Sequence, residues 1–309
     1  MEQKVKILVA TYNNEKYIEE LLDSLLSQSF SNIEIVIRDD GSCDSTLEIV
    51  NRIKESDSRI KILEIANSLK SAKSNFFTLL LNTPLEKNEY IMFADADDVW
   101  KKDKVEKTIE VMLTNETDLP TLVHTDLTVV DEQLNLIAPS LFKYEKISPE
   151  RKTLKNILVQ NNVTGCTVMI NSALKDMVNE YPKDTVMHDW WLTLIAATFG
   201  NIVVLNEQTI LYRQHGGNQI GAYDSNSLSQ GFKKLSNKER MKGIYISMFR
   251  QAGCFSEVFK EQLKEEDKIM LDNYRDMEYL SKIKKIAMII KGKYYKNTLL
   301  RNIGQFIVI

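Results

Sequence analysis

The sequence predicts an α/β fold, with a mostly parallel sheet covered by helices on both faces. Short apolar runs rich in β-branched residues recur along the first third of the chain, and a polar cluster closes several of them. Segments whose apolar residues repeat at helical spacing separate these runs. Strands that alternate with helices form parallel sheets of this kind. The length of 309 residues and the hydrophobic fraction of 43% are sufficient for a sizeable core.

The first part of the chain alternates strand and helix. The predicted strands are Val5–Ala10, Ile33–Ile37, Ile60–Ile65 and Tyr90–Ala94. Helices are predicted between them at 17–26, 45–53 and 76–81. Asn13 or Asn14 is the predicted cap of the first helix. Ser45 and Glu48 have the spacing of a capping box at the start of the second helix.

The alternation weakens after about Asp118. We expect strands or extended segments at 122–130, 164–170, 202–205 and 209–212, and helices at 154–159 and 189–199. From Gln230 onward the pattern is helical and charged. The sequence therefore predicts a first domain over residues 1–225 and a helical region over residues 226–309.

The segment 281–309 combines basic and apolar side chains without an acidic one. Its basic residues are Lys282, Lys284, Lys285, Lys291, Lys293, Lys296 and Arg301. A basic amphipathic segment binds to anionic membrane surfaces, but a terminal helix that packs on the body or on a second subunit has the same pattern. Two expectations therefore stand side by side: peripheral membrane contact through residues 281–309, or packing on protein, including a homo-oligomer.

Charge and cysteine content exclude other classes of protein. A net charge of −3 gives no reason to expect a nucleic-acid partner. Three widely spaced cysteines form neither a disulfide framework nor a zinc cluster, which favours a reducing compartment. No stretch of the sequence approaches the roughly eighteen apolar residues of a membrane span. We expect a cytoplasmic protein that works at the inner face of the cell membrane.

Polar clusters follow three of the predicted strands, at Thr11–Asn14, Asp39–Ser42 and Asp95–Asp98. In an open α/β sheet, ligands bind beyond the carboxyl ends of the strands. Two of the clusters carry adjacent carboxylates, which repel one another unless a cation is present. Mg²⁺ or Mn²⁺ takes oxygen ligands and leaves positions for substrate phosphates. Taken alone, the DDGS cluster is also explained as a turn with a helix cap, but the clusters together favour a metal-dependent site.

The segment ILVATYNNEKYIEELLDSLLSQSFSNIEIVIRDDGSCDST, followed by FADADDVW, resembles the family 2 glycosyltransferases, which have the GT-A fold. The resemblance covers roughly residues 4–220. It implies an inverting enzyme that uses a nucleotide-diphosphate sugar donor and a divalent metal, Mn²⁺ or Mg²⁺. The motifs HDWWL and YRQHGGNQIG are in addition similar to bacterial rhamnosyltransferases that build cell-wall or capsular rhamnan.

The resemblance also implies roles for individual residues. Around the donor nucleotide and its diphosphate it places Thr11, Tyr12, Asp39, Asp40, Asp95 and Ala96. We also expect Asn14 to bind the donor and Arg213 to donate charge-assisted hydrogen bonds to the phosphates. In the pocket for the transferred sugar and the acceptor the resemblance places Thr164, Gly165, Cys166, His188 and Trp190. The metal ligands implied are Asp97, in the DxD motif, and His215.

Asp189 is the catalytic base that the resemblance implies. An inverting transferase needs one carboxylate to take the proton from the acceptor hydroxyl. The predicted helix begins at Asp189, where the helix dipole favours a negative charge. A plain helix N-cap is the alternative interpretation of this residue.

These expectations combine into a function: transfer of L-rhamnose from dTDP-β-L-rhamnose to a glycan or lipid-linked glycan in cell-wall or capsular polysaccharide synthesis. Two alternatives stay open. One is a transferase of the same family that uses a UDP-hexose or UDP-N-acetylhexosamine, and the other is a non-catalytic partner subunit that binds a nucleotide sugar. A dinucleotide-dependent oxidoreductase is disfavoured because no G-x-G-x-x-G follows the first strand.

Overall fold

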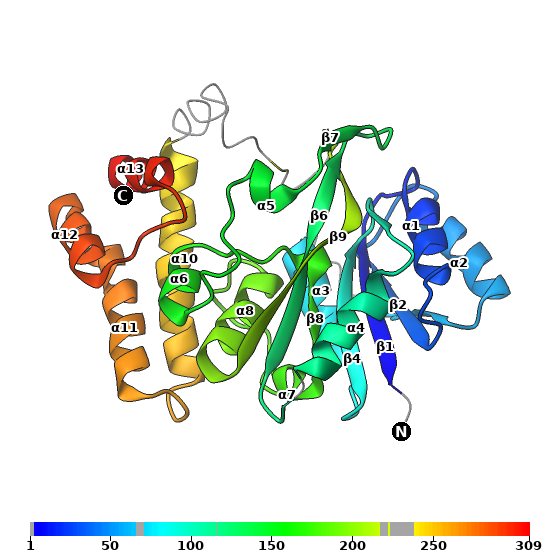
Figure 1. Ribbon diagram of the computed structural model, residues 1–309, viewed down its shortest axis with the longest axis horizontal. Helices are drawn as coiled ribbons and strands as arrows, with labels where there is room; N and C mark the ends of the chain where they lie inside the picture. Colours follow the sequence, from blue (N-terminus) through cyan, green and yellow to red (C-terminus); the bar gives the residue numbers. More distant parts are fainter. Residues whose placement is uncertain (1–2, 66–70, 116, 217–221, 223–237) are drawn as a thin grey trace. The chain divides into compact units, whose positions relative to one another are not determined.

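The computed structural model describes residues 3–65, 71–115, 117–216, 222 and 238–309. By its contacts the chain divides into two compact units. Unit 1 comprises Met1–Leu141, Val163–Tyr181 and Phe199–Ala222, and unit 2 comprises Phe142–Asn162, Pro182–Thr198 and Tyr223–Ile309. Among the described residues, every strand lies in unit 1 (Figure 1). Both units consist of segments that are separated in the sequence. The predicted domain boundary at residue 225 therefore stays a prediction.

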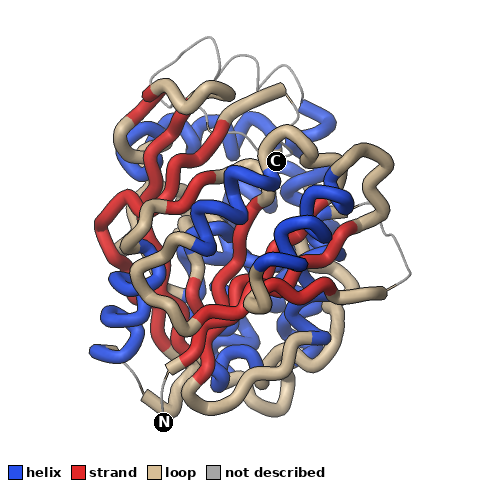
Figure 2. The backbone as a smooth tube through the Cα atoms, turned by 90° about the vertical axis from the view of Figure 1, so that its right-hand side faces the viewer, coloured by secondary structure: helices blue, strands red, loops and turns tan. Residues whose placement is uncertain are grey.

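Unit 1 is built on one mixed sheet (Figure 2). Its strands are β1 (Lys4–Thr11), β2 (Ile33–Asp39), β3 (Ile60–Ile62), β4 (Glu89–Asp95), β5 (Val99–Trp100), β6 (Thr121–Val130), β7 (Leu136–Ala138), β8 (Met169–Ile170) and β9 (Asn201–Arg213). Their order is β3-β2-β1-β4-β8-β6-β9-β5, with β7 paired to β6. The strands β3, β2, β1 and β4 are parallel, whereas β8 is antiparallel to both of its neighbours. The parallel part is the one predicted to present the polar clusters.

Five helices lie entirely in unit 1 among the residues that the structure describes. They are α1 (Ile18–Leu26), α2 (Thr46–Ser56), α3 (Ala72–Asn82), α4 (Lys104–Thr114) and α7 (Ser172–Lys175). Helix α3 packs on β1 and β2, and α4 packs on β6 and β9. In α1, Ile18, Leu21 and Leu25 are completely buried, as their helical spacing predicts.

The predicted cap of α1 is wrong. The helix begins after Tyr17, and the carbonyl of Asn14, not a side chain, accepts the amide N–H groups of Tyr17 and Ile18. The side-chain amides are held elsewhere in the loop, because Asn14 Nδ2 donates to the carbonyl of Tyr12 and Asn13 Oδ1 accepts from the N–H of Cys43.

The predicted capping box of α2 is also wrong. Ser45 occupies the cap position, but its side chain makes no capping hydrogen bond. Asp44 Oδ1 instead accepts the N–H of Thr46 at 3.0 Å. A carboxylate is the stronger acceptor for an amide in the first turn of a helix.

Two extended segments differ from their predictions. Within 164–170, Gly165–Thr167 forms a turn of 3-10 helix before β8 begins. The segments predicted at 202–205 and 209–212 are one strand, β9, which pairs in parallel with β6 through register shifts beside Asp126.

Unit 2 consists of helices in its described residues. They are α5 (Leu141–Tyr144), α6 (Leu154–Val159), α8 (His188–Phe199), α10 (Lys238–Val258), α11 (Glu265–Asp276), α12 (Lys282–Gly292) and α13 (Leu299–Val308), with a 3-10 turn at Met277–Tyr279. The first residue of α5, Leu141, and the last residue of α8, Phe199, are assigned to unit 1. The helical C-terminal region is confirmed from Lys238 onward, and residues 230–237 lie outside the described part. Of the helices described, none has the length and apolar character that crossing a membrane requires.

Candidate active site

The carboxyl ends of β1, β2 and β4 lie level with one another in the sheet. Thr11 pairs with Asp39 across β1 and β2, and Ala10 pairs with Asp95 across β1 and β4. The three polar clusters therefore begin along one edge of the sheet, the edge at which open α/β sheets bind ligands.

The two aspartates after β2 have different surroundings. Asp39 Oδ2 accepts the N–H groups of Gly41 at 2.9 Å and Ser42 at 2.7 Å, in a tight turn where Gly41 has a φ of 88°. Asp40 is 2% exposed and forms an ion pair with Arg38, at 3.1 Å from Nη1 to Oδ1. Asp40 thus anchors the loop, whereas Asp39 is partly exposed at the sheet edge.

The loop after β1 presents one exposed aromatic ring. Thr11 is buried, and its carbonyl accepts the N–H of Asp40 at 2.9 Å. The N–H of Asn14 donates to Thr46 Oγ1 at 2.8 Å, which joins the loop to α2. Tyr12 is 43% exposed, so its ring is the one in this loop that is accessible to a ligand.

The DADD motif and the end of β9 bring a carboxylate and an imidazole together. His215 Nε2 lies 2.8 Å from Asp97 Oδ2, although the two residues are far apart in sequence. Both side chains are mostly but not fully buried. Their donor atoms, a carboxylate oxygen and an imidazole nitrogen, suit a divalent cation such as Mn²⁺. Ala96 between the two aspartates is buried at 4% exposure.

A second group of ligand-type atoms includes the other two aspartates of the DADD motif. One ligand atom from each of Asp95, Asp98 and Cys166 lies within 4.8 Å of the others. Burial, and then the charges of Asp97 and Asp95, raise the pKa of Asp98 well above its usual value. Burial, and then the charges of Asp98 and Asp95, raise the pKa of the Cys166 thiol well above its usual value. Cys166 is therefore a protonated thiol and not a nucleophile.

Lys104 lies in the same buried layer. It is completely buried, its ammonium lies 4.3 Å from the centre of the Trp100 ring, and burial lowers its pKa to about 7. No sequence signal marks this lysine, because it occupies the first turn of an ordinary amphipathic helix.

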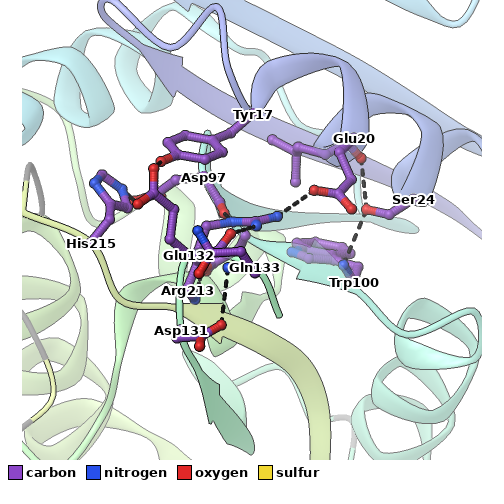
Figure 3. Close-up of polar contacts among 12 residues, drawn as sticks. Tyr17, Glu20, Ser24, Asp97, Trp100, Asp131, Glu132, Gln133, Arg213 and His215 are labelled. Carbon is purple, nitrogen blue, oxygen red and sulfur yellow. Dashed lines mark hydrogen bonds and ion pairs between the residues drawn. The ribbon is translucent and has the colours of Figure 1, made fainter. Parts of the chain in front are cut away.

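Arg213 holds three segments of unit 1 together (Figure 3). It is 3% exposed. Its Nε donates to the carbonyl of Asp97 at 2.8 Å, its Nη1 donates to the carbonyl of Glu132 at 2.6 Å, and its Nη2 forms an ion pair with Glu20. Each guanidinium nitrogen thus donates to a protein oxygen, whereas we expected donation to the donor phosphates.

Tyr17 lies against both Arg213 and His215. The guanidinium carbon is 4.9 Å from the centre of its ring, and the His215 ring centre is also 4.9 Å away. The hydroxyl donates to Glu132 Oε1 at 2.7 Å. Partial burial, and then this hydrogen bond, raise the pKa of Tyr17 to about 12, so it remains a neutral phenol.

The sequence did not single out Tyr17, Glu20 or Glu132. Tyr17 was counted with the apolar stripe of its helix. The three-residue spacing of Tyr17 and Glu20, which puts them on one side of α1, is the only sequence signal for their proximity.

In unit 2, Asp189 lies in the first turn of α8. The helix begins at His188, so Asp189 is not the N-cap. Its Oδ2 accepts from Asn161 Nδ2 at 3.0 Å, and its Oδ1 accepts the N–H of Trp190 at 2.8 Å. Hydrogen bonds of this kind and the helix dipole stabilise a negative charge. The sequence did not reveal Asn161 as its partner.

Two neighbours of Asp189 are held by unit 2. Burial lowers the pKa of His188 to about 3, so its imidazole is neutral. Trp190 Nε1 donates to the carbonyl of Ile157 at 2.7 Å, and the ring is partly exposed.

Two further predicted pocket residues belong to unit 1. Thr164 and Gly165 are partly exposed at the start of the 3-10 turn. Residues 217–221 of the YRQHGGNQIG motif lie outside the described residues.

Comparison with known proteins gives one family. The model described as "Glycosyl transferase family 2" matches residues 6–178. The chain is 33% identical over 228 residues to the dTDP-rhamnosyl transferase RfbG of Shigella flexneri. This match covers 69% of the chain and 74% of RfbG. It is 37% identical over 110 residues to the UDP-Glc:alpha-D-GlcNAc-diphosphoundecaprenol beta-1,3-glucosyltransferase WfaP of Escherichia coli. This second match covers 36% of the chain and 41% of WfaP.

Solved structures show the same fold. S. aureus TarS in complex with UDP-GlcNAc matches with a TM-score of 0.58 at 20% identity, over 99% of this chain and 88% of that one. The mannosyltransferase PcManGT from Pyrobaculum calidifontis, in complex with GDP-Man and Mn²⁺, matches with a TM-score of 0.55 at 14% identity, over 99% and 84%. The predicted GT-A fold is thereby confirmed. Since the family model spans more than half of the sequence, the chain belongs to glycosyl transferase family 2 and is a glycosyltransferase.

Proposed function

We propose that this enzyme is an inverting transferase that moves L-rhamnose from dTDP-β-L-rhamnose to a glycan or lipid-linked glycan in cell-wall or capsular polysaccharide synthesis. The likeness to RfbG, named a dTDP-rhamnosyl transferase, supports the donor. The likeness to WfaP, whose name includes a diphosphoundecaprenol, supports a lipid-linked acceptor and hence work at the inner face of the membrane. The observation that carries the proposal is the Asp97–His215 pair at the carboxyl edge of the sheet.

Asp97 and His215 would hold a divalent cation, Mn²⁺ or Mg²⁺, next to the diphosphate. When bound, the cation neutralises the charge that develops on the diphosphate as the glycosidic bond breaks. The exposed ring of Tyr12 would border the nucleotide base, and Asp39 and Asp95, at the ends of β2 and β4, would bind the base and ribose.

Asp189 is the proposed base. Its carboxylate takes the proton of the acceptor hydroxyl, the hydroxyl oxygen bonds to the anomeric carbon, and the bond from that carbon to the diphosphate breaks. The leaving group is the nucleoside diphosphate, and the β-linked donor becomes an α-L-rhamnoside. The hydrogen bonds from Asn161 and the Trp190 amide orient the carboxylate and stabilise its charge.

Thermal stabilisation by nucleotide sugars tests the donor. The protein is melted with dTDP-rhamnose, UDP-glucose or UDP-N-acetylglucosamine, each with Mn²⁺ or with a chelator. We expect the largest metal-dependent rise in melting temperature with dTDP-rhamnose, accompanied by slow metal-dependent hydrolysis of that donor. A rise without hydrolysis, also in the presence of glycan acceptors, would indicate a non-catalytic partner subunit instead.

A UDP-sugar donor is the second candidate. The likeness to WfaP, named for its UDP-glucose donor, favours it. In the same experiment a metal-dependent rise with a UDP-sugar, and none with dTDP-rhamnose, would replace the rhamnosyl donor and leave the proposed metal ligands in place.

A further inference from the structure

We propose that α12 and α13 dock the enzyme on an anionic phospholipid surface. The proposal extends the proposed function, since a lipid-linked acceptor lies in such a surface. It rests, however, on its own observation: exposed apolar side chains stand among lysines in a segment without an acidic residue.

The apolar face consists of large side chains that point to solvent. Its residues are Ile283, Ile290, Leu299, Leu300, Ile303 and Ile307. Ile283 is 82% exposed and Leu299 is 76% exposed. A cluster of exposed apolar side chains rimmed by polar residues is typical of an interaction site. Ile283 and Ile290 lie seven residues apart on α12, and Leu299, Ile303 and Ile307 recur every fourth residue on α13. Each helix therefore has an apolar stripe on its exposed side.

The two helices are adjacent. Lys282 Nζ donates to the carbonyl of Ile307 at 2.7 Å, which joins the start of α12 to the end of α13. The helices lie next to each other in unit 2 (Figure 1). Their exposed apolar residues therefore lie on two adjacent helices of the same unit.

The structure divides the basic residues of this segment into two sets. Three pack on unit 2 itself: Lys285 over the ring of Phe249, Lys296 over the ring of Tyr245, and Arg301 beside Glu145. The others, Lys282, Lys284, Lys291 and Lys293, are exposed. The positive charge next to the apolar face is therefore carried by lysines on the outside of the helices.

Charge complementarity indicates which partner binds the exposed face of α12 and α13. A second copy of the chain, paired through the same face, would set lysines against lysines across a twofold interface. An anionic bilayer attracts these lysines, and each cation near its surface strengthens the binding. Helices with one apolar and one basic side lie in the headgroup region and bury the apolar side. Such a surface therefore matches both properties of the face.

Vesicle binding by the full chain tests the proposal. Co-sedimentation is measured with vesicles of phosphatidylcholine and phosphatidylglycerol in equal parts, and with phosphatidylcholine alone. We expect binding to the mixed vesicles only, weakened by salt because the attraction is screened. Reversing two exposed lysines, Lys284→Glu with Lys291→Glu, lowers the partition coefficient by at least about tenfold. Replacing two apolar residues, Ile283→Gln with Leu299→Gln, lowers it without a change of charge.

Helix α11 offers a matched control. Lys264 and Lys268 are exposed in the same unit, but they stand among Glu265, Glu266 and Asp267. The double reversal Lys264→Glu with Lys268→Glu changes the net charge by the same amount. We expect it to leave vesicle binding within about twofold of the wild type, since charge away from the face is screened over roughly 8–10 Å.

Three results would overturn the proposal: equal binding to neutral vesicles, equal loss in the α11 control, or unchanged binding after Lys284→Glu with Lys291→Glu. A dimer in solution that Ile283→Gln with Leu299→Gln dissociates, with no vesicle binding by the wild type, would assign the face to a second copy. Metal-dependent hydrolysis of dTDP-rhamnose without vesicles reports on the proposed function separately. We expect Lys284→Glu with Lys291→Glu to retain that hydrolysis, so the two proposals can fail independently.

Discussion

Arg213 distributes its hydrogen bonds over three separate segments of unit 1. Two of its acceptors are backbone carbonyls, of Asp97 and Glu132, and the third is the carboxylate of Glu20. Its own N–H donates to Asp98 Oδ1 at 3.1 Å. The backbone that carries Asp97 is therefore held by Arg213 through its carbonyl group. We infer that Arg213 positions the proposed metal ligand instead of contacting the donor phosphates.

Replacing Arg213 by lysine tests this role. Arg213→Lys keeps the charge, but a single ammonium cannot serve two carbonyls and a carboxylate in the same positions. We expect a loss of unfolding free energy on the order of 2–3 kcal/mol, because buried carbonyls lose their donors, and weaker Mn²⁺ binding by calorimetry. Glu20→Gln is the control with a smaller expected effect, since Glu20 is 47% exposed. Loss of donor affinity at an unchanged melting temperature would assign Arg213 to the phosphates after all.

Asp189→Asn removes the proposed base and keeps the shape of the side chain. We expect the transfer rate to fall on the order of 10²–10⁴-fold, because proton removal from the acceptor is no longer assisted. The melting temperature and the stabilisation by donor should stay close to wild type. The rate is measured by release of nucleoside diphosphate with acceptor present. A variant with full activity would remove Asp189 from the mechanism.

For single residues, the sequence predicts the charged side chains at the ends of the strands. It does not predict the residues that form hydrogen bonds with functional side chains. Asp39 and Asp97 are visible because adjacent carboxylates follow two predicted strands whose ends meet at one edge of the sheet. Glu132 lies in an ordinary polar turn and Asn161 in an irregular loop. Their roles depend on which distant residues the fold brings to them, and no local pattern encodes that.

Helix α8 begins with a buried imidazole. His188 is 3% exposed, and burial lowers its pKa to about 3 from an ordinary value of 6.5. In the unfolded chain the same group binds a proton below pH 6.5. Between these two values the unfolded state holds more protons, so stability is present above pH 6.5 and is lost as the pH falls toward 3.

The pH dependence of unfolding measures this loss. Burial of neutral His188 should reduce the unfolding free energy by about 2 kcal/mol between pH 7 and pH 5. Denaturant melts of the wild type and of His188→Gln at both values give the difference. We expect the variant to be less stable at pH 7 but to lose about 2 kcal/mol less on acidification. Equal losses in both proteins would show that His188 is protonated in the fold.

The predicted elements agree with the structure best where one element occupies one stretch of sequence. β1, β2 and β4 lie within a few residues of their predicted ranges. β9 was predicted as two strands because polar residues, Asn206 to Gln208, interrupt its apolar pattern. Pairing with β6 continues through this stretch by shifts of register. Such pairing is a property of two strands together, so one strand's pattern does not show it.

The two units of the molecule interleave along the chain. Each is assembled from three separate segments. In unit 2, Trp191 of α8 is 1% exposed, and its ring centre lies 5.3 Å from that of Phe255 and 6.2 Å from that of Phe259. Side chains before and after residue 225 therefore form one core. Local composition changes near this residue, which is why the sequence predicts a boundary there, but long-range packing is not visible in composition.

A chain that ends at residue 225 tests the predicted boundary. It would expose Trp191 and its apolar neighbours on α8, because α10 is missing. We expect no sharp thermal transition and strong binding of a hydrophobic dye, in contrast to the full chain. A shortened chain that melts cooperatively near the wild-type temperature would establish residues 1–225 as an autonomous domain.

The alternation of the two units along the chain also limits how such a protein can evolve by recombination. The chain passes from one unit to the other five times, after residues 141, 162, 181, 198 and 222. One recombination crossover therefore cannot exchange either unit intact between two genes, because it would combine segments from different parents within a single core. Variation between relatives should then accumulate by substitution and by insertion in surface loops, with both units diverging together.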